Sequence, residues 1–386
     1  MGKKKIPEEG IYDARELGAG RMFVLGFQHM FAMFGATVLV PILTGLDVST
    51  TLLFAGLGTL LFHLITGGIV PAFLGSSFAF LGGYATIAPM IDGQPNKEML
   101  PYACFGVACA GLVYVILSAL FKAFGAKKVM RFFPPIVTGP IIIAIGLNLS
   151  SSAINNCAQN WWIAMVAIVI IIAANIWGKG MIKIIPILLG VIGSYVVAVI
   201  CDASVRATLV QNVSNAKWFA LPIYKEETVF GLLTSGNVDA HLLLTSVITI
   251  VPLSLATMVE HIGDVSAISS TCNRNYIENP GLHRTLMGDG LATTLAALFG
   301  APANTTYGEN TGVLALSKIY DPRVIRIAAI LAMCFSFSPK FAAIISSMPG
   351  GTIGGVSLVL YGMISAVGVR NVVENKIGRA SCRERV

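Results

Sequence analysis

Five ionisable side chains interrupt otherwise apolar stretches of this sequence: His29, Glu260, His261, Asp264 and Glu309. A charged group at the centre of a bilayer costs at least about 2.5 kcal/mol, so it usually marks a ligand contact, a proton relay or a transport pathway. Glu260 and Asp264 are four residues apart and share one face of a helix. Lost solvation and mutual repulsion favour the protonated form of such carboxyl groups. We therefore predict proton coupling through Glu309, Glu260 and His29.

Each of these residues also has a less specific interpretation. The carboxyl groups could form a pair buried for packing, and His29 could be an interior histidine bonded to a neighbour. His261 points about 100° away from Glu260 around a helix and is expected to pack elsewhere.

Metal and nucleotide chemistry find little support in the sequence. A zinc protease motif needs two histidines four residues apart, which Glu260-His261-x-x-Asp264 lacks. The sequence also has no Gly-x-x-x-x-Gly-Lys-Ser/Thr loop for a nucleotide phosphate. We expect no metal and no cofactor, with transport driven by an ion gradient and the proton as the coupling ion.

The composition places these residues in a membrane. The 386 residues are 55% hydrophobic and only 12% charged, and the mean hydropathy is +0.78. Soluble domains carry about 25% charged residues, and half that density cannot solvate the surface of a globule. This composition excludes a soluble enzyme, a nucleic-acid-binding protein and a disordered chain. It predicts an all-α polytopic membrane protein in contact with the lipid bilayer.

Twelve segments are long and apolar enough to be candidate spans. They lie at about 21–41, 50–66, 71–90, 101–121, 132–150, 160–177, 184–201, 241–267, 285–300, 304–319, 323–345 and 349–369. The third and the tenth are short and interrupted by Gly, Ser, Thr and Asn.

The distribution of Lys and Arg between the loops predicts the orientation. With the N-terminus inside, only Lys97, Arg206, Lys217, Lys225 and Lys340 lie outside, and the other Lys and Arg before residue 377 lie inside. The net charge of +7 is thus a topology signal. We expect a multi-pass protein of the bacterial cytoplasmic (inner) membrane with a cytoplasmic N-terminus.

A pattern occurs twice in the chain. Gln28-His29 is followed after about 45 residues by Ser76-Ser77-Phe78, and Glu260-His261 after a similar interval by Asn304-Thr305-Thr306-Tyr307. Seven spans separate the copies, so the second would be inverted, as in many secondary transporters with a midplane site. We expect 76–80 and 304–307 to be extended, to pair, and each to begin a half-helix whose N–H groups point inward.

At these positions the sequence resembles the nucleobase–ascorbate transporter family (nucleobase:cation symporter-2), most closely its bacterial uracil permeases. Three blocks between about residues 20 and 376 carry the resemblance. They are Gln28-His29 with the run 31–41 and Gly75-Ser76-Ser77-Phe78-Ala79-Phe80, then Glu260-His261-x-Gly263, then 304–318. The last block contains the family signature Gln/Glu-Asn-x-Gly-x-x-x-x-Thr-Arg/Lys as Glu309, Asn310, Gly312, Ser317 and Lys318, with Ser317 in place of Thr.

The resemblance implies about fourteen spans in two inverted repeats of seven, of which twelve are present here. It implies a cytoplasmic segment (1–20), a core domain (21–121 and 241–345), a gate domain (132–201 and 349–376) and an extracellular loop (202–240). The core would move against the gate like an elevator, often in a homodimer joined through the gate. Two gate spans would then be missing.

The last ten residues, 377–386, have no counterpart in the family pattern. They resemble the translation of a common short-read sequencing adaptor read in frame with Lys376. We predict that they are an assembly artefact, the alternative being a natural basic tail.

The resemblance also implies a substrate site. Glu260 and Glu309 match the acidic residues that hold the base. Phe78, Tyr307 and Gly308 match positions whose backbone groups contact it, and Ala36 lines the same pocket. Asp264 matches a position that is often histidine in uracil carriers and often aspartate in purine carriers.

The implied function is proton-coupled import of uracil, with xanthine or uric acid as the alternative because of Asp264. The chemistry agrees, since Glu260 and Glu309 can accept the two N–H groups of uracil, and backbone N–H groups near Phe78 and Gly308 can donate to its carbonyls. An anion exchanger or channel is less consistent with two carboxyl groups in the site. An intramembrane enzyme would lack a complete catalytic constellation.

Overall fold

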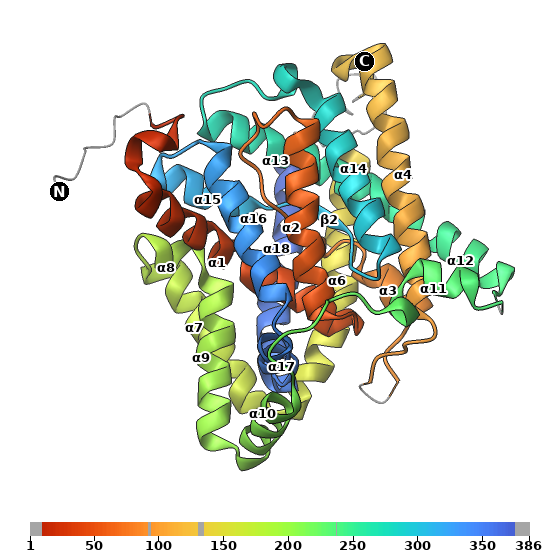
Figure 1. The fold of residues 1–386 in the computed structure, drawn as a ribbon, viewed down its shortest axis with the longest axis vertical. Coiled ribbons are helices and arrows are strands. Elements are labelled where there is room, and N and C mark those ends of the chain that lie inside the picture. Colours follow the sequence, from red (N-terminus) through yellow and green to blue (C-terminus); the bar gives the residue numbers. More distant parts are fainter. Residues whose placement is uncertain (1–9, 92–93, 130–134, 237, 375–386) are drawn as a thin grey trace.

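The computed structural model describes residues 10–91, 94–129, 135–236 and 238–374, and helices dominate it (Figure 1). Residues 377–386, the predicted artefact, lie outside the described residues.

Each of the twelve predicted spans corresponds in order to one element or to one broken pair. These are α1 (Ala19–Thr44), α2 (Val48–Ile65), β1 (Leu74–Ser76) with α3 (Leu81–Ile87), α4 (Leu100–Phe124), α6 (Pro135–Gln159), α7 (Trp161–Trp177), α9 (Pro186–Cys201), α12 (Ala240–Ile250) with α13 (Ser254–Thr271), α14 (Leu282–Leu298), β2 (Asn304–Thr306) with α15 (Gly308–Ser317), α16 (Pro322–Ser336) with α17 (Pro339–Ser346), and α18 (Gly350–Glu374). Shorter helices connect them: η1 (Ala14–Leu17), α5 (Ala126–Val129), α8 (Met181–Ile184), α10 (Ala203–Asn215), η3 (Lys225–Glu227), α11 (Val229–Thr234), η4 (Val251–Leu253) and η5 (Ile277–Gly281).

Not every predicted span is a straight helix. Six helices of the described chain are long and apolar enough to cross a membrane, and counting each sharply bent pair as one span makes eight. The eleventh predicted span bends by 86° between α16 and α17. Pro339 opens α17 there, and a proline cannot continue the preceding helix. Hydropathy therefore located this span but not its bend, whereas the interruptions of the third and tenth spans were expected from their Gly, Ser, Thr and Asn residues.

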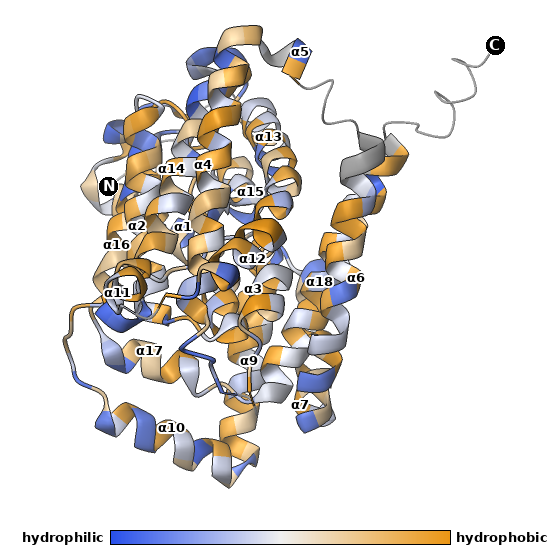
Figure 2. Cartoon of the chain, turned by 90° about the vertical axis from the view of Figure 1, so that its right-hand side faces the viewer, coloured by the Kyte–Doolittle hydropathy of each residue, from blue (hydrophilic) through white to orange (hydrophobic). Residues whose placement is uncertain are grey.

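The helices form two packed groups. Helices α6, α7, α9 and α18 pack against one another, with α18 running along α6 (Figure 2). In the other group α2 lies against α14 and α16, and α4 against α14. Helices α4 and α14 approach closely at Gly111 and Gly290, which have no side chain in the way. A Cβ on either glycine would lie 2.7 Å from the carbonyl oxygen of the other. Small residues at such contacts are how helices associate in lipid.

The two strands form an antiparallel pair beside the helices of the second group. Leu74 lies opposite Thr306, Gly75 opposite Thr305 and Ser76 opposite Asn304. The expected pairing is therefore present, but the first extended segment was placed too late, at 76–80. The chain already turns at 78–80 and enters α3 at Leu81.

Two threonines explain this register. Thr59 Oγ1 on α2 accepts the Leu74 N–H at 2.9 Å, which anchors β1 at its first residue. Thr293 Oγ1 on α14 donates to the Asn304 carbonyl at 2.9 Å and anchors β2 in the same way. The hydrogen bonds satisfy backbone groups that a short strand leaves unpaired at membrane depth.

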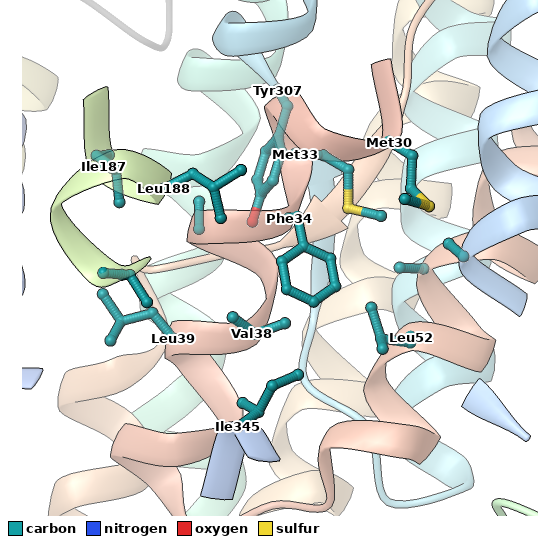
Figure 3. Packing of buried hydrophobic residues seen from close by; sticks show 14 of the residues in the cluster. Met30, Met33, Phe34, Val38, Leu39, Leu52, Ile187, Leu188, Tyr307 and Ile345 are labelled. Carbon is teal, nitrogen blue, oxygen red and sulfur yellow. The ribbon is translucent and has the colours of Figure 1, made fainter. Parts of the chain in front are cut away.

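The two groups meet along an apolar seam beside α1 (Figure 3). Phe34 and Val38 of α1 belong to the same buried cluster as Leu188 of α9 and Ile345 of α17. A Cβ on Gly35 would lie 3.1 Å from the Leu188 backbone nitrogen. Helices α1 and α9 are thus in direct contact at this point.

The segment 202–240, expected as a loop, contains α10, η3 and α11. It connects the two groups across one end of the molecule. Asn212 Nδ2 donates to Ser347 Oγ at 2.9 Å, and Thr50 Oγ1 donates to the Pro222 carbonyl at 3.0 Å. Lys97 and Glu227 form a 2.9 Å ion pair, and the hydrogen bond to Glu227 raises the pKa of Lys97.

Candidate functional site

The paired strands each lead into a short helix, and this arrangement positions the candidate site. The ladder extends by one hydrogen bond at either end, from Ser77 N to the Ala303 carbonyl (2.8 Å) and from Tyr307 N to the Phe73 carbonyl (3.2 Å). Helix α15 begins directly afterwards at Gly308. Gly308 is exposed, and a Cβ there would have no atom within 4 Å. The N-terminus of α15 therefore faces open space, where it favours electronegative atoms.

The side chain of Tyr307 has a structural task. Its hydroxyl donates to the Ser76 carbonyl at 2.7 Å, and Ser76 Oγ donates to the Thr37 carbonyl at 3.1 Å. The ring lies over Gly75, where a Cβ would come within 2.5 Å of it. Tyr307 is buried, and its backbone N–H is already used in the ladder. A backbone contact between Tyr307 and a substrate stays a prediction.

The three predicted carboxyl groups lie on adjacent helices. Glu260 and Asp264 are on α13, Glu309 is in the first turn of α15, and these helices contact each other. Electrostatic repulsion acts between Glu260 and Glu309 and between Asp264 and both. Glu260 is exposed although its helix is part of a candidate membrane span, whereas Asp264 and Glu309 are half-buried. The structure thus brings these groups together beside an open space.

Asp264 is less free than Glu260. Its Oδ2 accepts a 2.8 Å hydrogen bond from Thr306 Oγ1, at the last residue of β2. The aspartate therefore joins α13 to the strand pair and offers its remaining acceptor capacity to the site.

His29 is connected to the site through the signature asparagine. Asn310 Nδ2 donates to the His29 carbonyl at 3.0 Å and lies 3.2 Å from His29 Nδ1. His29 is buried, and among the described residues its Nε2 has no hydrogen-bond partner. The histidine contacts the helix that carries Glu309, and its role in proton coupling stays a prediction.

The remaining signature residues position and terminate α15. A Cβ on Gly312 would lie 3.5 Å from Ile184 of α8, so α15 contacts α8 there. Ser317 Oγ accepts the Ile319 N–H at 3.3 Å. Lys318 ends α15 in the left-handed conformation (φ 54°), and its carbonyl accepts the Ile11 N–H at 2.8 Å. Ser317 and Lys318 therefore terminate the helix.

Phe78 and Ala36 lie in different surroundings. Phe78 is half-buried and packs against the apolar cluster that contains Val40 and Tyr361. Ala36 and Glu309 line one pocket of about 200 Å³ between the two helix groups. Among the described residues no group of three or more His, Cys, Asp or Glu side chains is arranged to hold a metal ion.

Asp289 is a buried carboxyl group that was not predicted from the sequence. Asp289 of α14 lies 3.0 Å from His261, Oδ2 to Nδ1, and both side chains are fully buried. His261 thus points away from the site, as its position next to Glu260 predicts. Asp289 interrupts a predicted span just as Glu309 does, so the same signal was present. Its charge acts on Glu260 through space.

The chain is similar to known proteins over nearly its whole length. The family model described as "Permease family" (Xan_ur_permease) matches residues 20–383. A uracil permease of Bacillus caldolyticus is 38% identical over 376 residues, covering 95% of this chain and 83% of its own length. A uracil permease of Bacillus subtilis is 39% identical over 390 residues, with 98% and 85% covered. The putative pyrimidine permease RutG of Escherichia coli K12 is 37% identical over 382 residues, with 97% and 83% covered.

Two solved structures have the same inverted-repeat fold of core and gate. The transmembrane domain of the cyanobacterial bicarbonate transporter BicA aligns with a TM-score of 0.62 at 14% identity, covering 95% of this chain and 98% of that one. SLC26A9 aligns with a TM-score of 0.64 at 11% identity, with 92% and 59% covered. At this identity the likeness concerns the fold, which does not determine the substrate.

Proposed function

The chain belongs to the permease family of nucleobase–ascorbate transporters, and from this we propose that it is a proton-coupled symporter that imports uracil. It is a multi-pass membrane transporter and not an enzyme. Relatives named uracil permeases are 38–39% identical over nearly its whole length, which supports uracil as the substrate.

The observation that carries the proposal is the position of Glu309 in the first turn of α15, next to Glu260 and beside open space. Uracil presents alternating N–H donors and carbonyl acceptors on a flat ring. The two carboxyl groups accept from its N–H groups, while N–H groups at the start of α15 donate to a carbonyl. A site of this kind rejects analogues that leave a buried polar group unpaired.

We infer proton coupling from the free-energy cost of carrying ionised carboxyl groups in this site. Moving ionised Glu260 and Glu309 together through an apolar environment is unfavourable, and binding a proton removes one of the two charges. We place the coupling proton on Glu309 or Glu260, with His29 behind Asn310. During transport the core helices slide past the gate helices along the apolar seam between α1 and α9. That seam consists of apolar contacts that can be exchanged without breaking ion pairs.

Assembly and orientation form part of the same proposal. The exposed lipid-facing side of the α6, α7, α9 and α18 group is the surface for a homodimer, and the N-terminus is cytoplasmic, in the bacterial cell membrane. Cysteine accessibility at the N-terminus in intact cells, compared with permeabilised cells, tests the orientation.

A second candidate substrate is xanthine or uric acid, and the Asp264–Thr306 hydrogen bond favours it. An aspartate held in place beside the site offers an additional acceptor, which suits the extra N–H groups of an oxidised purine.

Uptake into proteoliposomes decides between the two substrates. Labelled uracil and xanthine are supplied with and without an inward proton gradient. Gradient-dependent uracil uptake that excess xanthine leaves unchanged supports uracil. Xanthine uptake transfers the proposal to the purine, and uptake of neither by correctly inserted protein contradicts both.

A further inference from the structure

The pocket of about 200 Å³ next to Glu309 has polar groups from both helix groups. Glu309 and Ala36 line it from α15 and α1, and Asn175 of α7 and Lys183 of α8 line it from the other side. Its volume equals that of about seven water molecules at 30 Å³ each, which is the size class of a single-ring base. The pocket is therefore large enough for the proposed substrate.

Asn175 is an unusual residue for its helix, and a ligand would explain its presence there. Every other residue of α7 is apolar: the helix reads WWIAMVAIVIIIAANIW. The side chain is half-buried and makes no hydrogen bond or ion pair to the described part of the chain. A polar side chain in such a helix usually faces a cavity or pathway. Here it faces the pocket that contains Glu309.

Lys183 is the second unusual group in the pocket. It is exposed, and it too has no hydrogen bond or ion pair within the described residues. It lies on the short helix that joins α7 to α9, on the side predicted to be cytoplasmic. Its ammonium group donates only, the Asn175 amide both donates and accepts, and the Glu309 carboxylate accepts. Together they match a ring edge with adjacent N–H and C=O groups.

The pocket ends at the contact between α1 and α9. A Cβ on Gly35 would meet the Leu188 backbone at 3.1 Å. Beyond this contact lies a second cavity lined only by apolar and aromatic residues, among them Phe34, Val191 and Tyr195. A polar ligand that leaves Glu309 on this side therefore finds hydrogen-bonding groups only toward Asn175 and Lys183.

We propose that Asn175 and Lys183 form a release subsite, a second, short-lived position for the nucleobase between Glu309 and the cytoplasm. This inference rests on the proposed function and adds two residues of the gate helices to it. The base exchanges its bonds to Glu260 for bonds to the amide and the ammonium before it leaves. A transient position of this kind lowers the barrier for entry and exit equally, so it changes rates and leaves the affinity of the main site alone.

Binding kinetics of purified protein in lipid nanodiscs test the subsite. The protein is loaded with labelled uracil, and dissociation is followed after dilution into excess unlabelled uracil. The test variants are Asn175→Ala, Lys183→Met and the double variant. The matched controls are Lys179→Met, a lysine four residues away that does not line the pocket, and Ile176→Ala, the exposed neighbour on α7.

Loss of one hydrogen bond of about 1 kcal/mol corresponds to a change of about five-fold. We expect each single variant to slow both association and dissociation by about that factor, with the Kd changed less than about two-fold. Asn175→Gln, which keeps the amide, restores part of the rate. The control variants match the wild type.

Three results would overturn the subsite. Unchanged rates in the double variant, with wild-type uracil binding intact, refute it and leave the proposed function standing. A Kd that weakens in parallel with a lower melting temperature assigns the two residues a structural role instead. A correctly folded wild-type protein that binds neither uracil nor xanthine refutes the proposed function, and the subsite with it.

Discussion

The Asn310 amide of α15 donates to the His29 carbonyl of α1 at 3.0 Å and lies 3.2 Å from the Nδ1 atom of the same histidine. One side chain thus fixes the helix that carries Glu309 against the first long helix. Both residues are buried, so the amide has no water with which to replace these partners.

Asn310→Ala tests this connection. Removing the amide leaves a buried carbonyl and ring nitrogen without a donor, which costs about 1–3 kcal/mol. We expect a lower melting temperature of the purified protein and weaker uracil binding. Ser317→Ala at the other end of α15 is the control, because among the described residues the hydrogen bond of the Ser317 side chain is a local one, from the Ile319 N–H. Equal melting temperatures for both variants would contradict the role of Asn310.

Glu309→Gln tests the proposed site of proton binding. Glutamine has nearly the same shape as glutamate but does not titrate. We expect uracil exchange between the two sides to continue and accumulation against a gradient to be lost. The measurement is uptake into proteoliposomes with and without an imposed pH gradient, with exchange measured in parallel. If the variant still accumulates uracil with the proton gradient, Glu309 does not carry the coupling proton.

Thr306→Val tests whether Asp264 contributes to substrate selection. The change removes the 2.8 Å hydrogen bond to Asp264 at nearly constant volume and leaves the carboxylate free to turn. One lost charge-assisted hydrogen bond is worth about 1.5–3 kcal/mol. We expect the ratio of uracil to xanthine affinity to shift by ten-fold or more, on the order set by that energy. Competition binding measures the ratio, and Thr311→Val on α15 is the matched control. An unchanged ratio would show that Asp264 does not contribute to the choice between uracil and xanthine.

Gly75→Ala tests the packing of the strand pair. The new methyl group would lie 2.5 Å from the Tyr307 ring and 2.6 Å from Thr37 Oγ1. Such overpacking costs about 1–3 kcal/mol. We expect a loss of thermal stability, whereas Gly82→Ala, which meets nothing within 4 Å on α3, keeps or raises it. A Gly75 variant as stable as the wild type would show that Tyr307 can move aside.

The Lys97–Glu227 ion pair predicts a pH dependence outside the membrane. Its hydrogen bond and attraction raise the pKa of Lys97 above the ordinary 10.5. A raised pKa stabilises the folded state below the unfolded pKa, and this contribution disappears as pH rises through the folded value. The contribution is below about 1 kcal/mol because Lys97 is largely exposed. Melting curves should therefore separate wild type from Lys97→Met near pH 8 and converge above pH 11 at low salt. Curves that stay equally far apart at both pH values would contradict the pair.

The spans and most of the candidate site could be predicted from the sequence, because a bilayer restricts the composition of the segments that cross it. A stretch of about 20 apolar residues has few alternatives to crossing the membrane, so the apolar segments were located from the sequence, although the structure bends or interrupts several of them. The carboxyl groups at 260, 264 and 309 were conspicuous for the same reason, since charge in an apolar span is expensive. Asp289 carried this signal too and was overlooked.

Other features depended on contacts between residues distant in the chain. The start of β1 at Leu74 depends on Thr59 of α2, and the start of β2 at Asn304 depends on Thr293 of α14. Neighbours in sequence say nothing about the partner of Asn310 or about the pocket that Asn175 shares with Glu309. The sequence by itself determined which residues enter the membrane, because that depends on each segment's own free energy of transfer. Only the tertiary structure decided which of them face each other there, because hydrogen bonds require atoms within about 3 Å.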